Sequence, residues 1–378
     1  MMSTSLPEAG HGLADAVAAV FAAAGATRVE PAVLQPADVF LDLTGEEMRS
    51  RMFVTLDAEG REWALRPEFT IPVARGYLAS AQAGAPAMLS YGGPVFRLRA
   101  GESGEFVQAG IESFGRSDCE AADAEVLALA VEAAARGGLA DPEIRLGDVG
   151  LFAALVDGLR LPPARVRQLR RAFAQGRLDA ASIEALGQAD GRAGEHAGLL
   201  RTLQGQDPRA ARGFVEDLLK IAGISSVGGR SAGEIAERFL AQSAQEGDEG
   251  LPAEQRAVLA RFIAIAGDPD SASSELRALA AEAGLELDAV LDAFDARTGF
   301  IAARGIDVTT LAFSAGFGRN LDYYTGAVFE LRDPRRPERK PIVGGGRYDG
   351  LLQRLGAAAP IPAVGCSVWL DRLPGADT

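Results

Sequence analysis

The stretch GFGRNLDYYTGAVFELRD occupies residues 316–333, and it is followed by GGGRYDGLLQRLG at 344–356 and PAVGCSVWLDRL at 362–373. Glycines let the backbone approach a ligand closely, and an arginine can hold a carboxylate through two parallel hydrogen bonds. Polar aromatic pairs beside such glycines and arginines suit a small zwitterionic ligand. The three segments therefore predict a dense binding site near the end of the sequence.

Length and composition indicate a folded globular protein. The chain has 378 residues, of which 48% are hydrophobic and 24% charged, as expected for two or three domains with a sizeable core. It contains no apolar run near the roughly 20 residues that span a bilayer, and its first residues do not resemble a signal peptide. We therefore expect a cytoplasmic protein with no membrane partner.

Charge and rare residues argue against several classes of function. The formal net charge of −14 predicts no nucleic-acid partner, because a surface of this sign repels phosphate backbones. The basic run at residues 165–173 is interpreted as the exposed face of an amphipathic helix. Cys119 and Cys366 lack metal-ligand spacing and are expected to be small buried residues. Since His11 and His196 lie far from the candidate site in the sequence, we expect no metal, no cofactor and no histidine-based catalysis.

Periodicity gives a coarse order of elements in the first part of the chain. Helical spacing predicts a helix over residues 12–24, and the proline-containing segment 25–40 is expected to be extended. Alternating apolar residues on both sides of a turn at 57–60 predict a hairpin within 52–75. Two further short strands joined by a polar loop are predicted within 90–115. Antiparallel pairing follows from these short connections.

A change in amino-acid composition and periodicity divides the chain. Residues 151–301 are rich in Ala, Leu, Arg and Glu at helical period and are predicted to form a helical insertion domain, which could be a lid, a docking surface or a spacer. Strand character returns afterwards. Residues 1–150 and 302–378 are therefore expected to form one discontinuous core, an α+β fold in which helices flank an antiparallel sheet.

Side chains suited to ligand binding gather on four segments that read as strands: ALRPEFT (64–70), PVFRLR (94–99), EFVQAGIESFG (105–115) and NLDYYTG (320–326). Residues at even separation on a strand face the same way. Gln108 and Glu112 are therefore expected to point together into one pocket.

Together these segments resemble class II aminoacyl-tRNA synthetases and, within that class, the histidyl-tRNA synthetase family. Pro31 stands where the first motif of that family has its dimer-interface proline. LRPEFT is similar to the family's LRPEGT, FR with EFVQAGIESFG to its second motif, and GRNLDYYTG to its histidine-binding RGLDYYTG. The resemblance covers most of residues 10–150 and 300–373, and it implies the class II synthetase-like sheet.

The resemblance also implies a histidine pocket. Its residues would be Glu68, Thr70, Arg97, Gln108, Glu112, Arg319, Tyr323, Tyr324, Gly344, Gly345 and Tyr348. Glu68, Thr70 and Gln108 would hold the α-ammonium group of the ligand. Gly344 and Gly345 would form the floor, with Tyr348 beside it.

The imidazole ring and the carboxylate of the ligand would have their own partners. Glu112 and Tyr324 would bond opposite nitrogens of the imidazole, and Arg97 and Arg319 would face the carboxylate. Two fixed partners across a ring reject ligands that lack either nitrogen, because each buried group left unpaired costs roughly 1–3 kcal/mol.

Departures from the family concern the nucleotide. The loop after FR is short and carries Glu102 and Glu105, whose charge would repel a triphosphate. Asn320 replaces a glycine, and Trp369 replaces the glycine of the family's GxxxGLER motif, so we expect its indole to fill the ATP position. The anticodon-binding domain that the family carries would have to follow Arg372, where six residues remain.

A histidine pocket without nucleotide functions resembles the regulatory subunits of ATP phosphoribosyltransferase. The resemblance implies a non-catalytic protein that forms a homodimer within a hetero-oligomer, partners a short catalytic subunit, and binds L-histidine as effector of the first step of histidine biosynthesis. The alternatives are a truncated synthetase-like enzyme that adenylates histidine with ATP, and a sensor with another partner.

Overall fold

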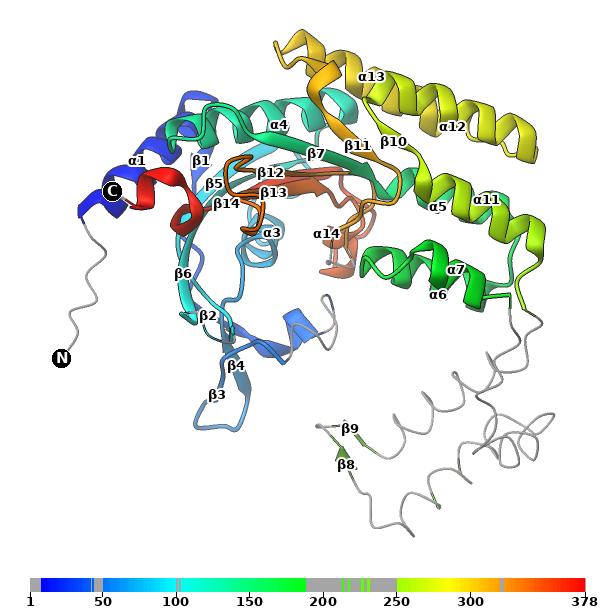
Figure 1. Ribbon diagram of the computed structural model, residues 1–378. Helices are drawn as coiled ribbons and strands as arrows, with labels where there is room; N and C mark the ends of the chain where they lie inside the picture. The colour runs from blue at the N-terminus through cyan, green and yellow to red at the C-terminus, as the bar shows by residue number, and fades with distance from the viewer. Residues whose placement is uncertain are drawn as a thin grey trace.

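The computed structural model describes residues 8–377, except 42, 44–49, 100, 102, 320–322 and most of 188–249. Its centre is a nine-stranded sheet (Figure 1). The strands, in spatial order, are β1 (Thr27–Arg28), β5 (Ala87–Phe96), β6 (Glu105–Phe114), β14 (Ala363–Trp369), β13 (Val343–Arg347), β12 (Ala327–Arg332), β7 (Glu143–Asp148), β11 (Ala312–Ser314) and β10 (Ala266–Gly267).

The sheet joins the two ends of the chain. β14 lies between β6 and β13 and is antiparallel to both, which confirms that the C-terminal strands rejoin the sheet begun near the N-terminus. The predicted pair within 90–115 is the long antiparallel hairpin of β5 and β6. Within the sheet, β1 with β5 and β11 with β7 pair in parallel. This strand order therefore brings residues more than 200 positions apart onto neighbouring strands.

Helices cover one face of this sheet. α1 (Glu8–Ala23) and α4 (Cys119–Arg136) lie side by side along it, and α1 confirms the helix predicted over 12–24 (Figure 1). α4 buries Ala122, Val126, Ala130 and Ala133, spaced three or four residues apart, against the strands. The opposite face carries α3 (Thr70–Leu78) and α14 (Leu351–Arg354), which contact each other, and it is hollowed beside the start of α3.

A second, three-stranded sheet holds β2 (Leu34–Pro36), β4 (Glu62–Leu65) and β3 (Val54–Leu56). β3 and β4 form the predicted hairpin, closed by Asp57, which accepts hydrogen bonds from the backbone of Glu59 and Arg61. Two expectations were wrong here. Residues 37–40 are helical rather than extended, because Ala37 and Phe40 share a buried helical face, and the C-terminal part of 52–75 belongs to α3.

Helices dominate the described part of residues 151–301. They are α5 (Val149–Gly158), α6 (Pro163–Ala174), α7 (Ala180–Ala185), α11 (Ala253–Ala264), α12 (Pro269–Ala283) and α13 (Asp288–Ala303). Phe152, Phe173 and Phe262 meet at their centre, with the first two rings stacked 4.0 Å apart. The basic run at 165–173 lies on α6, where Leu169 and Phe173 are buried.

This helical block also contacts the core. α13 packs along α4, and β10 pairs with β11 at the edge of the large sheet (Figure 1). The predicted domain boundaries at 151 and 301 remain a prediction. The remaining short elements are β8 (Ser226–Val227), β9 (Arg230–Ser231) and the 3₁₀ turns η1 (Val308–Thr310), η2 (Leu370–Arg372) and η3 (Pro374–Asp377). Of the helices that are described, none combines the length and the apolar character needed to span a bilayer.

Candidate functional site

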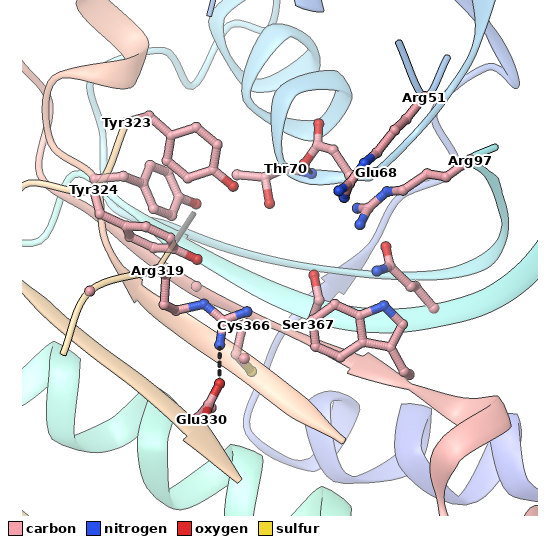
Figure 2. A pocket seen from close by; sticks show the side chains of 16 residues that line it. Arg51, Glu68, Thr70, Arg97, Arg319, Tyr323, Tyr324, Glu330, Cys366 and Ser367 are labelled. Carbon is pink, nitrogen blue, oxygen red and sulfur yellow. Dashed lines mark hydrogen bonds and ion pairs between the residues drawn. The ribbon is translucent and has the colours of Figure 1, made fainter. Parts of the chain in front are cut away.

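A cavity of about 330 Å³ lies on the open face of the large sheet. Its walls come from β6, β12, β13 and β14, from the start of α3 and from the loops that precede β3 and β12 (Figure 2). The residues that line it are Arg51, Glu68, Thr70, Arg97, Gln108, Gly318, Arg319, Tyr323, Tyr324, Glu330, Gly344, Tyr348, Gly365, Cys366, Ser367 and Trp369.

Most of the predicted site residues meet in this cavity. They are Glu68, Thr70, Arg97, Gln108, Arg319, Tyr323, Tyr324, Gly344 and Tyr348. Glu112 lies directly behind the wall, bonded to Tyr348 and Thr70. Gly345 faces away from the cavity, since a Cβ built on it would meet Phe329 and Cys366. Gly345 therefore contributes only its main chain to the floor of the cavity.

Glu112 is the most enclosed acid of the site. It lies on β6, is 1% exposed, accepts a hydrogen bond from Thr70 Oγ1 at 2.8 Å and contacts the hydroxyl groups of Tyr348 and Tyr91. Burial raises the pKa of Glu112 to about 8, although its hydroxyl partners favour the ionised form. At neutral pH the group therefore holds its proton and can both donate and accept a hydrogen bond.

Glu68 does not lie on a strand as predicted. Pro67 has no amide proton for a sheet ladder, and the chain turns there into α3. The Glu68 carboxylate accepts hydrogen bonds from the backbone amides of Thr70 (2.7 Å) and Ile71 (2.9 Å), which would otherwise be unpaired in the first turn of the helix. Burial raises the pKa of Glu68, while the nearby guanidinium of Arg97 opposes this shift. Arg97 itself is anchored through Nε to the carbonyl of Pro67 at 2.6 Å.

The tyrosine pair was also predicted on a strand, and this was wrong. Tyr323 and Tyr324 belong to the loop before β12, with ring centres 5.0 Å apart. Asn320 lies outside the described residues. Both rings line the cavity, and burial raises the pKa of both hydroxyl groups, so each keeps its proton at neutral pH. Two neutral phenols therefore face the ligand as hydrogen-bonding groups.

Arg319 crosses the floor of the cavity. Its Nη1 lies 3.7 Å from the carboxylate of Glu330 and donates to the carbonyl of Phe329 at 3.1 Å (Figure 2). A Cβ at Gly344 would come within 2.1 Å of the Arg319 guanidinium, so any larger residue would force that side chain to shift. Gly365 plays the same part for Glu112, whose Oε2 would lie 1.6 Å from a Cβ at that position. The glycines of β13 and β14 thus make room for charged side chains.

Trp369 ends β14 and lines the cavity with only 8% of its surface exposed. The guanidinium carbon of Arg372 lies 4.5 Å from the centre of its ring. A tryptophan facing the other side of the sheet would have been compatible with the sequence, but the structure places it in the site. Cys366 is buried as predicted, whereas Cys119 is only half-buried; both are free thiols.

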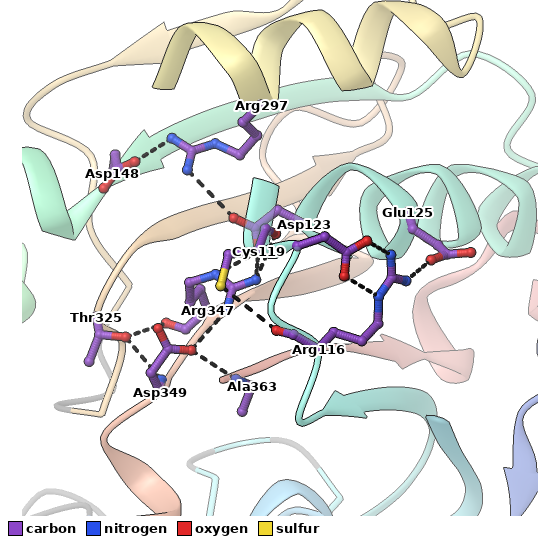
Figure 3. Close-up of polar contacts among 11 residues, drawn as sticks. Arg116, Cys119, Asp123, Glu125, Asp148, Arg297, Thr325, Arg347, Asp349 and Ala363 are labelled. Atoms are coloured by element: carbon purple, nitrogen blue, oxygen red, sulfur yellow. Dashed lines mark hydrogen bonds and ion pairs between the residues drawn. The ribbon is translucent and has the colours of Figure 1, made fainter. Parts of the chain in front are cut away.

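Arg347 and Asp349 flank Tyr348 in a network of ion pairs beside the cavity (Figure 3). Arg347 contacts Asp123 of α4 at 2.7 Å and Asp349 at 2.9 Å. Arg297 of α13 contacts the same Asp123 at 3.5 Å and also pairs with Asp148, which caps α5. The helical block is therefore tied by buried charges to the strand that ends at the pocket.

Sequence reasoning missed several lining residues. Glu330 and Ser367 lie inside segments that were quoted for other reasons. Strand alternation from Trp369 could have placed Ser367 on the cavity side, whereas Glu330 had no such reference residue on its strand. No motif or periodicity in the sequence marked Arg51 as a lining residue, because it reaches the cavity from the chain before β3. In the described ranges, no group of three or more His, Cys, Asp or Glu residues is arranged to hold a metal ion.

Comparison with known proteins agrees with this fold. The family model described as histidyl-tRNA synthetase matches residues 7–220 and 210–373. The ATP phosphoribosyltransferase regulatory subunit of Brucella canis is 41% identical over 347 residues, which cover 91% of this chain and 92% of the relative. The protein of the same name from Brucella ovis is equally similar over the same shares of both chains.

Solved structures show the same fold at lower identity. The ATP phosphoribosyltransferase regulatory subunit/histidyl-tRNA synthetase of Bacillus halodurans has a TM-score of 0.69 and 23% identity, over 99% of this chain and 81% of the other. The histidyl-tRNA synthetase of Nostoc has a TM-score of 0.63 and 18% identity, over 99% and 75%. The predicted class II synthetase-like fold is thereby confirmed. This chain belongs to the histidyl-tRNA synthetase family and, within it, to the ATP phosphoribosyltransferase regulatory subunits.

Proposed function

We propose that this chain regulates an ATP phosphoribosyltransferase, the enzyme of the first step of histidine biosynthesis. It assembles with a short catalytic subunit, is required for the activity of that subunit, and makes it sensitive to L-histidine. The observation that carries the assignment is the 41% identity to regulatory subunits along 91% of the chain. The alternative, an enzyme that adenylates histidine, has no such support.

Histidine fits the chemistry of the cavity. The ring of the ligand lies between Glu112 and Tyr324, and the buried carboxyl and phenol groups are matched to the two edges of an imidazole. The α-ammonium group lies toward Glu68, Thr70 and Gln108, the acidic end of the cavity. The negatively charged carboxylate of the ligand pairs with arginine side chains.

Those arginines are Arg97 and Arg319. Both line the cavity, and neither needs to move far, since each is already held by a backbone carbonyl. Preformed positions reduce the entropy lost when a ligand binds. This supports a receptor for one amino acid, with no cofactor.

Absence of catalysis is also part of the proposal. The indole of Trp369 fills part of the cavity, and Arg372 stacks on that indole, where it is unable to cover a purine at the same time. Without a bound nucleotide the ligand carboxylate is not activated. The protein then acts by its different affinities for histidine in the active and inhibited states of the assembly.

Co-expression with a short catalytic subunit tests the assignment. The two chains should co-elute, restore phosphoribosyl transfer and be inhibited by histidine. Glu112→Ala and Tyr324→Ala should each relieve inhibition while co-elution persists, because they remove partners of the imidazole. Inhibition unchanged in both variants would contradict the proposed site.

Exchange of labelled pyrophosphate into ATP tests the alternative. Purified protein should give no histidine-dependent exchange, and robust exchange would reject the regulatory assignment in favour of adenylation. Homodimerisation through the region of Pro31, and a cytoplasmic location, remain predictions.

A further inference from the structure

Three polar atoms in the wall of the cavity are buried without a hydrogen-bond partner among the described residues. One is Nε of Arg319, whose guanidinium is already held through Nη1. The other two are Gln108 Oε1 and Trp369 Nε1. Both residues line the cavity, and their side chains are 1% and 8% exposed. They are also direct neighbours, because Trp369 of β14 pairs with Gln108 of β6 in the antiparallel register. A buried acceptor and a buried donor therefore stand side by side, both unpaired.

Leaving such groups unpaired is costly. Each buried polar atom without a partner loses about 1–3 kcal/mol relative to its hydrated state, and the great majority of such atoms in native proteins are paired. The two atoms belong to the cavity wall rather than to the packed core. Because both side chains line the cavity, a bound ligand can supply the missing partners after a small shift of the two side chains.

The pair matches the main-chain end of an amino acid. An indole N–H is a donor only, so it suits a carboxylate, and an amide oxygen is an acceptor, so it suits an ammonium group. The surrounding charges suit such a ligand, since the cationic side chains of Arg51 and Arg97 and the acidic side chain of Glu68 all line the same cavity. Glu112, one of the two proposed partners of the ring, is already bonded to Tyr348 and does not compete for this pair.

We propose that Trp369 is a ligand-binding residue, whose indole N–H donates a hydrogen bond to the carboxylate of the amino-acid effector. The same side chain that fills the nucleotide space thus selects for a ligand with a free carboxylate. This inference rests on the proposed histidine site and adds to it a residue that the histidyl-tRNA synthetase motif does not contain, because a glycine stands there. The stacked guanidinium of Arg372 polarises the indole and strengthens its N–H as a donor.

Calorimetric titration of the full chain with L-histidine and with L-histidinol tests the proposal, because histidinol has a hydroxymethyl group in place of the carboxylate. Trp369→Phe should weaken histidine binding about tenfold or more, as expected for the loss of a hydrogen bond to a charged group. Binding of histidinol should change much less. Trp63→Phe is the matched control, since the Trp63 indole donates to Asp57 in the distant hairpin.

A sharper variant removes only the N–H group. In the Trp63→Phe background Trp369 is the only tryptophan, so it can be replaced by benzothienylalanine, which has sulfur in place of N–H and nearly the same shape. The same selective loss of histidine affinity is expected even if the phenylalanine variant is unstable.

Equal weakening of histidine and histidinol, or unchanged histidine affinity, would overturn the role of Trp369 and leave the histidine site standing. If the unmodified chain bound neither ligand, alone or with its catalytic subunit, the histidine site and this inference would fall together.

Discussion

Replacement of Glu112 by glutamine should make the stability of the protein less dependent on pH. Glutamine has nearly the same shape as a protonated glutamic acid and keeps a group that can contact the hydroxyls of Thr70 and Tyr348. It has no proton to lose. The comparison therefore isolates the cost of ionising one carboxyl group inside the cavity wall.

The size of the effect follows from the two pKa values. Burial raises the pKa of Glu112 from 4.5 in a model peptide to about 8 in the folded protein. A raised pKa gives stability that is complete below the lower value and is lost as the pH rises toward the higher one. Each pH unit between them costs about 1.36 kcal/mol, so wild-type protein should lose about 3 to 4 kcal/mol more than Glu112→Gln between pH 5 and pH 8.

Thermal and urea unfolding of both proteins over this pH range measure the difference. Titrating groups far from Glu112 are present in both proteins and cancel in the comparison. Glu68 is the exception, because its charge contributes to the raised pKa of Glu112 and its effect is therefore part of the measured difference. The Tm of the variant should exceed that of wild type at pH 8, and the gap should close toward pH 5. Parallel pH profiles, or a wild-type protein less sensitive than the variant, would refute the assignment of a protonated Glu112.

Two further predictions concern the ion network and the glycines. Arg297→Met should destabilise the protein by about 3 to 5 kcal/mol, because it removes the arginine partner of the buried Asp148 and one of the two arginine partners of Asp123. Arg277→Met, on exposed ion pairs of the same helical block, should hardly change the Tm. Similar melting of both variants would contradict a stabilising network. Gly365→Ala should abolish histidine binding measured by calorimetry, because the new Cβ would displace the Glu112 side chain. Gly76→Ala is the control, because Gly76 lies in α3 with open space around it. This control should bind histidine normally and gain about 0.5–1 kcal/mol of stability.

Much of the fold could be predicted from the sequence where period and turn chemistry agree. The hairpin around Asp57 and the long pair β5–β6 were recognisable from alternation and from polar turns. The segment at Glu68 was misjudged, because its apolar alternation continues through Pro67 while the backbone already turns into α3. In that segment the deciding interaction, a carboxylate capping backbone amides, leaves no periodic signal.

The site was predictable in its members but not in their arrangement. The match to the family motifs identified Gln108 and Tyr324 as site residues from the sequence alone. It did not reveal Arg51, whose place depends on how the chain before β3 passes over the cavity. Nor could it show that a Cβ at Gly345 would point toward Phe329 and away from the cavity, since a run of three glycines has no alternation of apolar and polar side chains.

The bare floor made by Gly344 and Gly365 has a genetic consequence. A single base change converts a glycine codon to an alanine codon, and one added methyl group at either position would collide with Arg319 or Glu112. If histidine is the effector, strains selected on a toxic histidine analogue should therefore include alleles at these two codons as well as at the codons of the residues that bind it. One glycine-to-alanine substitution could thus prevent ligand binding while every charged and polar side chain of the site is still present.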